Sequence, residues 1–115
     1  MTPFVEAYVM CALWSSVDEE GLPLDDQFDI EDIAPESLIE MTRDCEAFQE
    51  SEGADLERAG EDSQNGQDFW LTRNGHGAGF WDRGYGEVGR RLTEAAQVWG
   101  SSNLYIGYDG KLHIS

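Results

Sequence analysis

Basic side chains are scarce in this sequence. Its 115 residues include seven lysines and arginines against 24 aspartates and glutamates, so the formal net charge is −17. Proteins bind nucleic-acid phosphates through clustered lysine and arginine side chains, whereas Arg90 and Arg91 form the only adjacent basic pair here. We therefore expect no direct binding of nucleic acid.

Motifs for metals and nucleotides are also missing. The two cysteines and two histidines stand far apart, so nothing resembles a zinc signature. The acidic residues over 25–32 lack the spacing of a calcium loop. The glycine run over 75–79 has its third glycine one place too early for a dinucleotide fingerprint and has no βαβ context. We expect neither a cofactor nor a metal site.

Long hydrophobic runs are absent. The apolar stretch from Phe4 to Trp14 is interrupted by Glu6 and is too short to cross a bilayer. No basic segment of the kind that opens a signal peptide precedes it. We expect a protein of a reducing cytosol with no membrane contact. Cys11 and Cys45 are then expected to be free, buried thiols, and a structural disulfide is the alternative.

What the sequence does have is apolar material for one core and a segregated charge. Hydrophobic residues make up 40% of the chain, which predicts one domain over 1–115. Residues 1–62 contain nineteen acidic and two basic residues, whereas residues 63–115 contain five of each. The first half is expected to be an acidic, helical half, and the second a neutral half that folds as hairpin, helix and hairpin.

The spacing of apolar residues and turn signals predicts an α+β fold. Helical periodicity covers 4–14, where a strand is the alternative, and also 35–52 and 87–99. An acidic loop is expected over 17–34, a short extra turn over 54–59 and a polar linker over 60–67. Asn74-Gly75 and Asp109-Gly110 are hairpin signals. They predict strands over 68–73, 79–82, 103–108 and 111–114. We expect about three helices packed on one face of a four-stranded, mainly antiparallel sheet.

The segment over 68–83 is the one place where catalytic chemistry is conceivable. His76 lies between two glycines and could act as a general base oriented by Asp82 or Asp68, with Arg73 and Arg83 beside it. The competing interpretation is that the glycines make a turn while the acidic and basic residues brace the hairpin. Because no nucleophile or metal accompanies the histidine, we expect the protein not to be an enzyme.

The acidic half offers a different chemistry, which is imitation of a phosphate backbone. Duplex DNA carries one charge per about 1.7 Å of axis. Acids four residues apart on a helix stand about 6 Å apart along its axis. The candidate partner-binding residues are Asp25, Asp26, Asp29, Glu31, Asp32, Glu36, Glu40, Asp44, Glu46 and Glu50. Such a face would suit a basic nucleic-acid-binding groove. The alternative is an ordinary solvated face.

A long block of this sequence is similar to one found in small acidic proteins encoded by bacteriophages and mobile elements. The block is DFWLTRNGHGAGFWDRG, over 68–84, followed by GEVG over 86–89 and LTEAA over 92–96. The stretches CALWSS over 11–16 and DIAP over 32–35 resemble the same group. The resemblance implies a phage accessory protein that works in the bacterial cytoplasm, and it carries no catalytic residues over to this chain. At the level of class, small acidic phage proteins resemble inhibitors of host defence, several of which imitate DNA.

These observations favour an anti-defence inhibitor that binds a basic host protein, either a CRISPR effector or a restriction enzyme. The first alternative is a small enzyme or ligand-binding module centred on Arg73, His76, Asp82 and Arg83, which requires those side chains to converge in a pocket. The second is a phage assembly or host-takeover adaptor, which an exposed patch containing Trp70, Trp81 or Trp99 would favour. A homodimer is compatible with each of the three.

Overall fold

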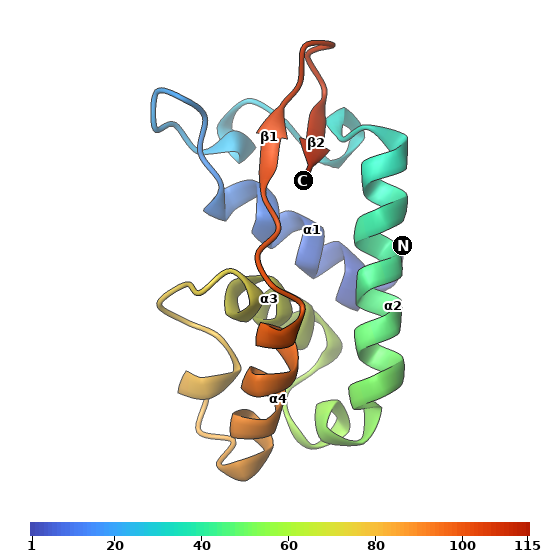
Figure 1. The fold of residues 1–115 in the computed structure, drawn as a ribbon, viewed down its shortest axis with the longest axis vertical. Helices are drawn as coiled ribbons and strands as arrows, with labels where there is room; N and C mark the ends of the chain where they lie inside the picture. The colour runs from blue at the N-terminus through green and yellow to red at the C-terminus, as the bar shows by residue number, and fades with distance from the viewer.

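The computed structural model describes residues 1–115 as a mainly helical fold (Figure 1). Its helices are α1 (Pro3–Ser15), α2 (Pro35–Arg58), α3 (Asp62–Arg73) and α4 (Glu87–Val98). Short 3₁₀ turns occupy Leu24–Asp26, Ile30–Asp32 and Phe80–Asp82, and one hairpin is formed by β1 (Leu104–Ile106) and β2 (Leu112–Ile114). The expected fold class is therefore wrong: there are four helices and a two-stranded antiparallel sheet, not three helices on a four-stranded sheet.

Three of the helices begin where the local sequence predicts. The hydroxyl of Thr2 accepts a hydrogen bond from the amide of Val5 (3.2 Å), and Pro3 occupies the first turn of α1. Pro35 likewise opens α2, and Glu87 lies in the first turn of α4. Helices α1 and α2 cover their expected ranges, α4 ends at Val98, one residue before its predicted end, and α1 is a helix rather than the alternative strand.

Helix α2 unites the helix predicted over 35–52 with the extra turn predicted over 54–59. Its apolar stripe is buried as expected at Met41, Cys45 and Phe48. The predicted stop near Gly53 is a kink, and the short extra turn predicted over 54–59 is present as helix up to Arg58. The backbone departs from helical geometry at Glu52 and then continues to Arg58. A glycine inside a helix costs only about 1 kcal/mol, and the continuation is stabilised because it buries Leu56.

Helix α3 replaces the predicted linker over 60–67 and the predicted strand over 68–73. The strand was predicted from consecutive large apolar residues, Phe69 to Leu71, but α3 contacts α1, α2 and α4, and these residues are buried as part of a helix. A surface helix shows a hydrophobic period of about 3.6 residues because one of its faces is polar. A helix that is enclosed on several sides has no such polar face, so its sequence does not show that period. The polar Asn65 is buried too, and its amide group donates to the carbonyls of Leu56 (3.1 Å) and Gly60 (3.0 Å).

The first predicted hairpin is therefore also wrong. Asn74 caps α3, and Gly75 takes a positive φ of 68° where the chain turns away from the helix. The expected return strand over 79–82 is a 3₁₀ turn that packs Phe80 into the core. The Asn-Gly pair thus ends a helix rather than joining two strands.

The second hairpin is confirmed, and it closes one end of the molecule. Tyr105 pairs with His113 in an antiparallel register. The outer edge of β2 is joined to the start of α2, because the amide of Ala34 donates to the carbonyl of Leu112 (2.8 Å) and the amide of Ile114 donates to Ser37 (3.2 Å). The loop over 17–34 is also confirmed; Leu24 holds it to the core, whereas Leu22 is exposed.

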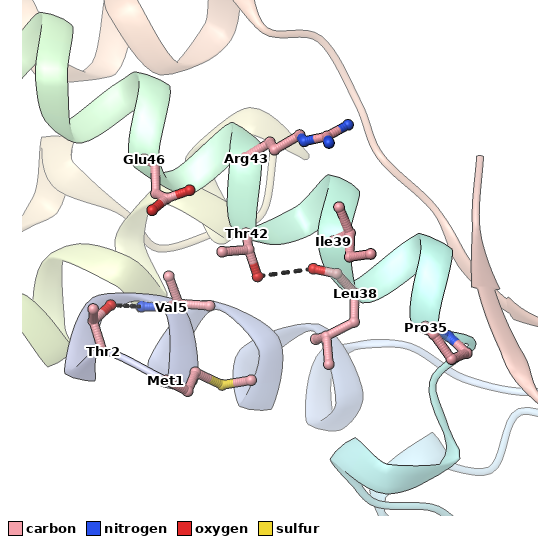
Figure 2. A pocket seen from close by; sticks show the side chains of 9 residues that line it. All are labelled: Met1, Thr2, Val5, Pro35, Leu38, Ile39, Thr42, Arg43 and Glu46. Atoms are coloured by element: carbon pink, nitrogen blue, oxygen red, sulfur yellow. Dashed lines mark hydrogen bonds between the residues drawn. The ribbon is translucent and has the colours of Figure 1, made fainter.

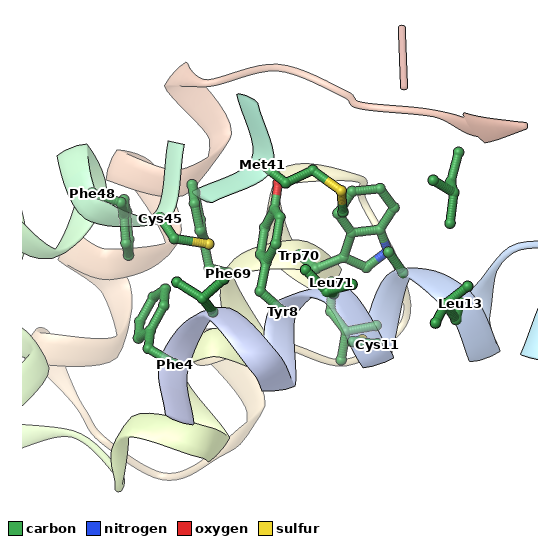
Figure 3. Packing of buried hydrophobic residues seen from close by; sticks show 14 of the residues in the cluster. Phe4, Tyr8, Cys11, Leu13, Met41, Cys45, Phe48, Phe69, Trp70 and Leu71 are labelled. Carbon is green, nitrogen blue, oxygen red and sulfur yellow. The ribbon is translucent and has the colours of Figure 1, made fainter. Parts of the chain in front are cut away.

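One hydrophobic cluster unites both halves of the chain (Figure 3). Phe48 of α2 stacks on Phe69 of α3 with ring centroids 4.0 Å apart. Tyr8 of α1 meets Trp70 edge to face at 5.3 Å. Because α3 contributes to both contacts, it is the central element against which the acidic half packs. None of the helices combines the length and the apolar composition that crossing a bilayer requires.

Both cysteines are free and buried, which leads to a prediction about their reactivity. Burial raises the pKa of the Cys11 thiol to about 12, with a further increase from Asp68, and burial also raises the pKa of Cys45. The thiolate is the reactive form. We expect neither thiol to react with a chromogenic disulfide reagent at pH 8 in the native protein, and both to react in guanidinium chloride. A thiol titrated rapidly without denaturant would contradict this burial.

Candidate interaction face

The acidic residues of the first half lie on the outside of the fold. The loop over 17–34 lies near the hairpin at one end of the molecule, and α2 runs from there along the long axis (Figure 1). Its 24 residues correspond to about 36 Å of helix, against a longest dimension of 43 Å for the molecule. The loop and α2 therefore distribute their carboxylates over much of its length.

The two halves differ in how their charges are compensated. Of the nineteen acids up to Asp62, only two are in ion pairs, Asp44 with Arg73 (2.9 Å) and Asp55 with Arg91 (2.8 Å), which leaves seventeen without a basic partner. Four of the five acids after Asp62 pair with an arginine, namely Asp68, Asp82, Glu87 and Glu94, and Asp109 bonds to His113. Folding therefore concentrates the uncompensated charge in the first half.

Four of the predicted residues lie on the outward face of α2, which also carries the exposed Arg43 and Ile39. Glu36, Glu40, Glu46 and Glu50 are exposed. Asp44 does not belong with them, because its side chain is only 24% exposed and is held by Arg73. Its spacing from Glu40 suggested a continuous row, but an inward-facing arginine on α3 removes it from that row.

The five predicted loop acids all lie on the two short 3₁₀ turns or cap them. Asp25 and Asp26 belong to the first turn and are exposed. In the second turn, the carboxylate of Asp29 accepts from the amide of Glu31 (3.0 Å), while Asp32 accepts from the amide of Asp29 (2.9 Å). These bonds hold the carboxylates in place without neutralising them.

The four residues of the alternative pocket have separate surroundings. Arg73 points inward, where its guanidinium donates to Asp44, to the hydroxyl of Tyr8 (3.0 Å) and to the carbonyls of Trp99 (3.3 Å) and Gly100 (2.9 Å). His76 is exposed on the loop after α3. None of the four residues of the alternative pocket lines any of the four principal hollows of the surface.

Arg83 and Asp82 also have structural partners. The guanidinium of Arg83 binds Asp68 through its Nε and Nη2, with a shortest distance of 2.9 Å. The Asp68 side chain is fully buried. Burial raises the pKa of this carboxyl above its ordinary value, an effect that the bonds from Arg83 oppose. Asp82 accepts from the amide of Gly79 (3.0 Å). The block over 68–84 thus uses its charged groups to hold α3 and the following loop together.

The tryptophans named for an adaptor surface are distributed differently. Trp70 is buried in the core, Trp99 is partly buried against it, and Trp81 is 53% exposed. The three therefore do not form one exposed aromatic patch.

Two hollows were not foreseen from the sequence. One, of about 800 Å³, lies between the start of α1 and α2 and is lined mainly by Met1, Val5, Leu38 and Ile39 (Figure 2). The other, of about 560 Å³, lies between the loop over 17–24 and β1. Both are formed by segments distant in sequence, so no local pattern could have indicated them.

No group of three or more histidine, cysteine or acidic side chains is placed to hold a metal ion. Comparison of the chain with protein-family models, with curated proteins and with solved structures gives no match.

Proposed function

We propose that this chain is a phage-encoded inhibitor of bacterial defence that binds the basic nucleic-acid groove of a CRISPR effector or a restriction enzyme. The observation that carries the proposal is the contrast in compensation: seventeen of nineteen acids in the first half have no basic partner, whereas four of the five acids in the second half pair with an arginine and the fifth, Asp109, bonds to His113. Charge kept only for solubility would not need that division.

The arrangement on α2 supports the same proposal. Exposed acids recur from Glu36 to Glu50, over about 21 Å of continuous helix before the kink at Glu52, a length comparable to about six base pairs of duplex DNA. A groove that binds DNA neutralises its phosphates with lysines and arginines, which could equally pair with these carboxylates. Such complementarity gives fast association that weakens as salt is added. The partner would release its bound nucleic acid when the inhibitor occupies the groove.

Affinity capture from a nuclease-treated bacterial lysate, with identification by mass spectrometry, tests the proposal. We expect the retained proteins to include one with a nucleic-acid groove, and we expect both added salt and added duplex DNA to elute it. The variant Glu36→Gln/Glu40→Gln removes two charges from the outward face of α2. It should lower the salt concentration needed for elution.

The matched control is Glu87→Gln/Glu94→Gln, which changes the net charge by the same amount on α4, where both acids pair with Arg90. Capture by this control should equal that of the unmodified protein. The proposal is wrong if duplex DNA does not compete with the captured protein, or if the two variants weaken capture equally.

A further inference from the structure

The hollow between the acidic loop and the hairpin combines an apolar floor with acidic walls. Val17, Leu22 and Ile106 line it and are 55%, 48% and 41% exposed, and Tyr105 adds an aromatic face. An adjoining hollow shares Tyr105 and Ile106 and extends toward the hairpin turn. Exposed apolar side chains gathered in a concave site mark an interaction surface. We call the joined hollows the loop–hairpin groove.

The groove also borders an open strand edge. Asn103 and Ser115 exchange hydrogen bonds (3.3 and 3.0 Å), and the amide of Gly107 donates to Lys111 (2.8 Å). Opposed residues of an antiparallel pair alternate between bonded and non-bonded. The N–H and C=O of Ile106 therefore point away from β2. The outer edge of β2 is bonded to the start of α2. Strand β1 lies between β2 and the loop over 17–24, which is blue in Figure 1.

The charged side chains along the groove are acidic, apart from His113 in the adjoining hollow, which bonds to Asp109. Asp18, Glu19 and Glu20 line the groove and are in no ion pair. The carboxylate of Asp18 accepts from the amides of Glu20 and Leu22, each at 2.9 Å, and from Gln27. These bonds fix the backbone of the loop, so Glu19 and Glu20 project from fixed positions beside the apolar floor.

We propose that the loop–hairpin groove binds an extended, cationic segment of a protein partner, in which a lysine or arginine adjoins an apolar residue. The apolar side chain contacts Val17 and Leu22, while the cation lies between Glu19 or Glu20 and the ring of Tyr105. The segment's main chain pairs with the free groups of Ile106, as in strand addition. A second copy of this chain is disfavoured as the occupant, because each copy carries a net charge of −17.

This inference deepens the proposed function and rests on it for the kind of partner, which is a basic protein. Binding at the groove can nevertheless be tested separately from the proposed function. The probe is a fluorescent ten-residue peptide alternating arginine and valine, and binding is followed by anisotropy at physiological salt. Glu19→Gln/Glu20→Gln should weaken binding by about three- to tenfold, the range for two exposed charge pairs. Leu22→Ser, at a half-exposed position, should also weaken it. Circular dichroism verifies that both variants are folded.

Two other variants separate the possible failures. Glu87→Gln/Glu94→Gln, with the same change in charge, should bind the peptide as the unmodified protein does. If Glu36→Gln/Glu40→Gln weakens binding of the peptide but Glu19→Gln/Glu20→Gln does not, the peptide binds α2 and not the groove. The groove proposal then fails, whereas the proposal that the acidic face of α2 binds a basic partner is supported. If Leu22→Ser has no effect, the contact is charge alone and the groove proposal fails. Peptide binding at the groove with no DNA-competed capture from lysate would instead overturn only the proposed function.

Discussion

The variant Gly66→Ala is expected to lose about 3 kcal/mol or more of unfolding free energy, at or beyond the upper end of the usual cost of overpacking a core. Gly66 lies on the face of α3 that meets α1, and a Cβ there would overlap the carbonyl oxygen of Phe4 and lie 2.9 Å from its carbonyl carbon. Main chain cannot move aside as a flexible side chain can. The two helices must separate, which disturbs the aromatic cluster between them.

The matched control is Gly53→Ala, because nothing lies within 4 Å of a Cβ added there. Alanine in a helix is favoured over glycine by up to about 1 kcal/mol, so this variant should be unchanged or slightly more stable. Guanidinium unfolding followed by tryptophan fluorescence measures both. Equal stability of the two variants would mean that α1 and α3 are not packed as closely as described.

The variant Arg73→Ala is expected to destabilise the protein by about 3–5 kcal/mol, the usual cost of removing one partner of a buried ion pair. Its guanidinium binds Asp44, Tyr8 and two backbone carbonyls, and its side chain is only 6% exposed. It also lies over the rings of Phe69 and Trp99, at 5.6 and 5.7 Å. Its removal leaves several polar groups without a partner and a space beside the aromatic rings.

A double-mutant cycle with Asp44→Ala separates the ion pair from the rest of this network. If the pair contributes, the double variant should lose less stability than the two single losses combined. Arg90→Ala is the comparison for a surface arginine, because both of its ion pairs are exposed, and it should change stability little. A loss for Arg73→Ala as small as that for Arg90→Ala would show that Arg73 is not a structural residue.

The elements that could be predicted from the sequence are those with one face toward solvent. Helix α2 has a narrow apolar stripe opposite acidic residues, and α4 also has an apolar face opposite a polar one. The apolar residues of both helices therefore recur with a period of about 3.6 residues. The last hairpin is marked by Asp109-Gly110 between two short apolar runs. Helix α3 shows no such period, because it is enclosed by other elements and its polar residues, including Asn65 and Asp68, find partners inside the fold.

The candidate site divides in the same way. That the negative charge belongs to residues 1–62 is a property of composition, and no fold could change it. Which of those acids remain uncompensated depends on where the six arginines of the chain point. Asp44 and Glu40 cannot be distinguished by spacing, yet Asp44 is bound to Arg73 while Glu40 is exposed.

By itself the sequence determined the sign and placement of the charge, three of the four helices and the final hairpin, because each of these depends on residues close together along the chain. Tertiary structure alone decided that 62–73 is a helix, that Arg73 binds Asp44, and that the loop over 17–24 and β1 enclose a groove. Each of these depends on residues that are distant in sequence and come into contact only when the core forms. A pattern of neighbouring residues cannot predict such contacts.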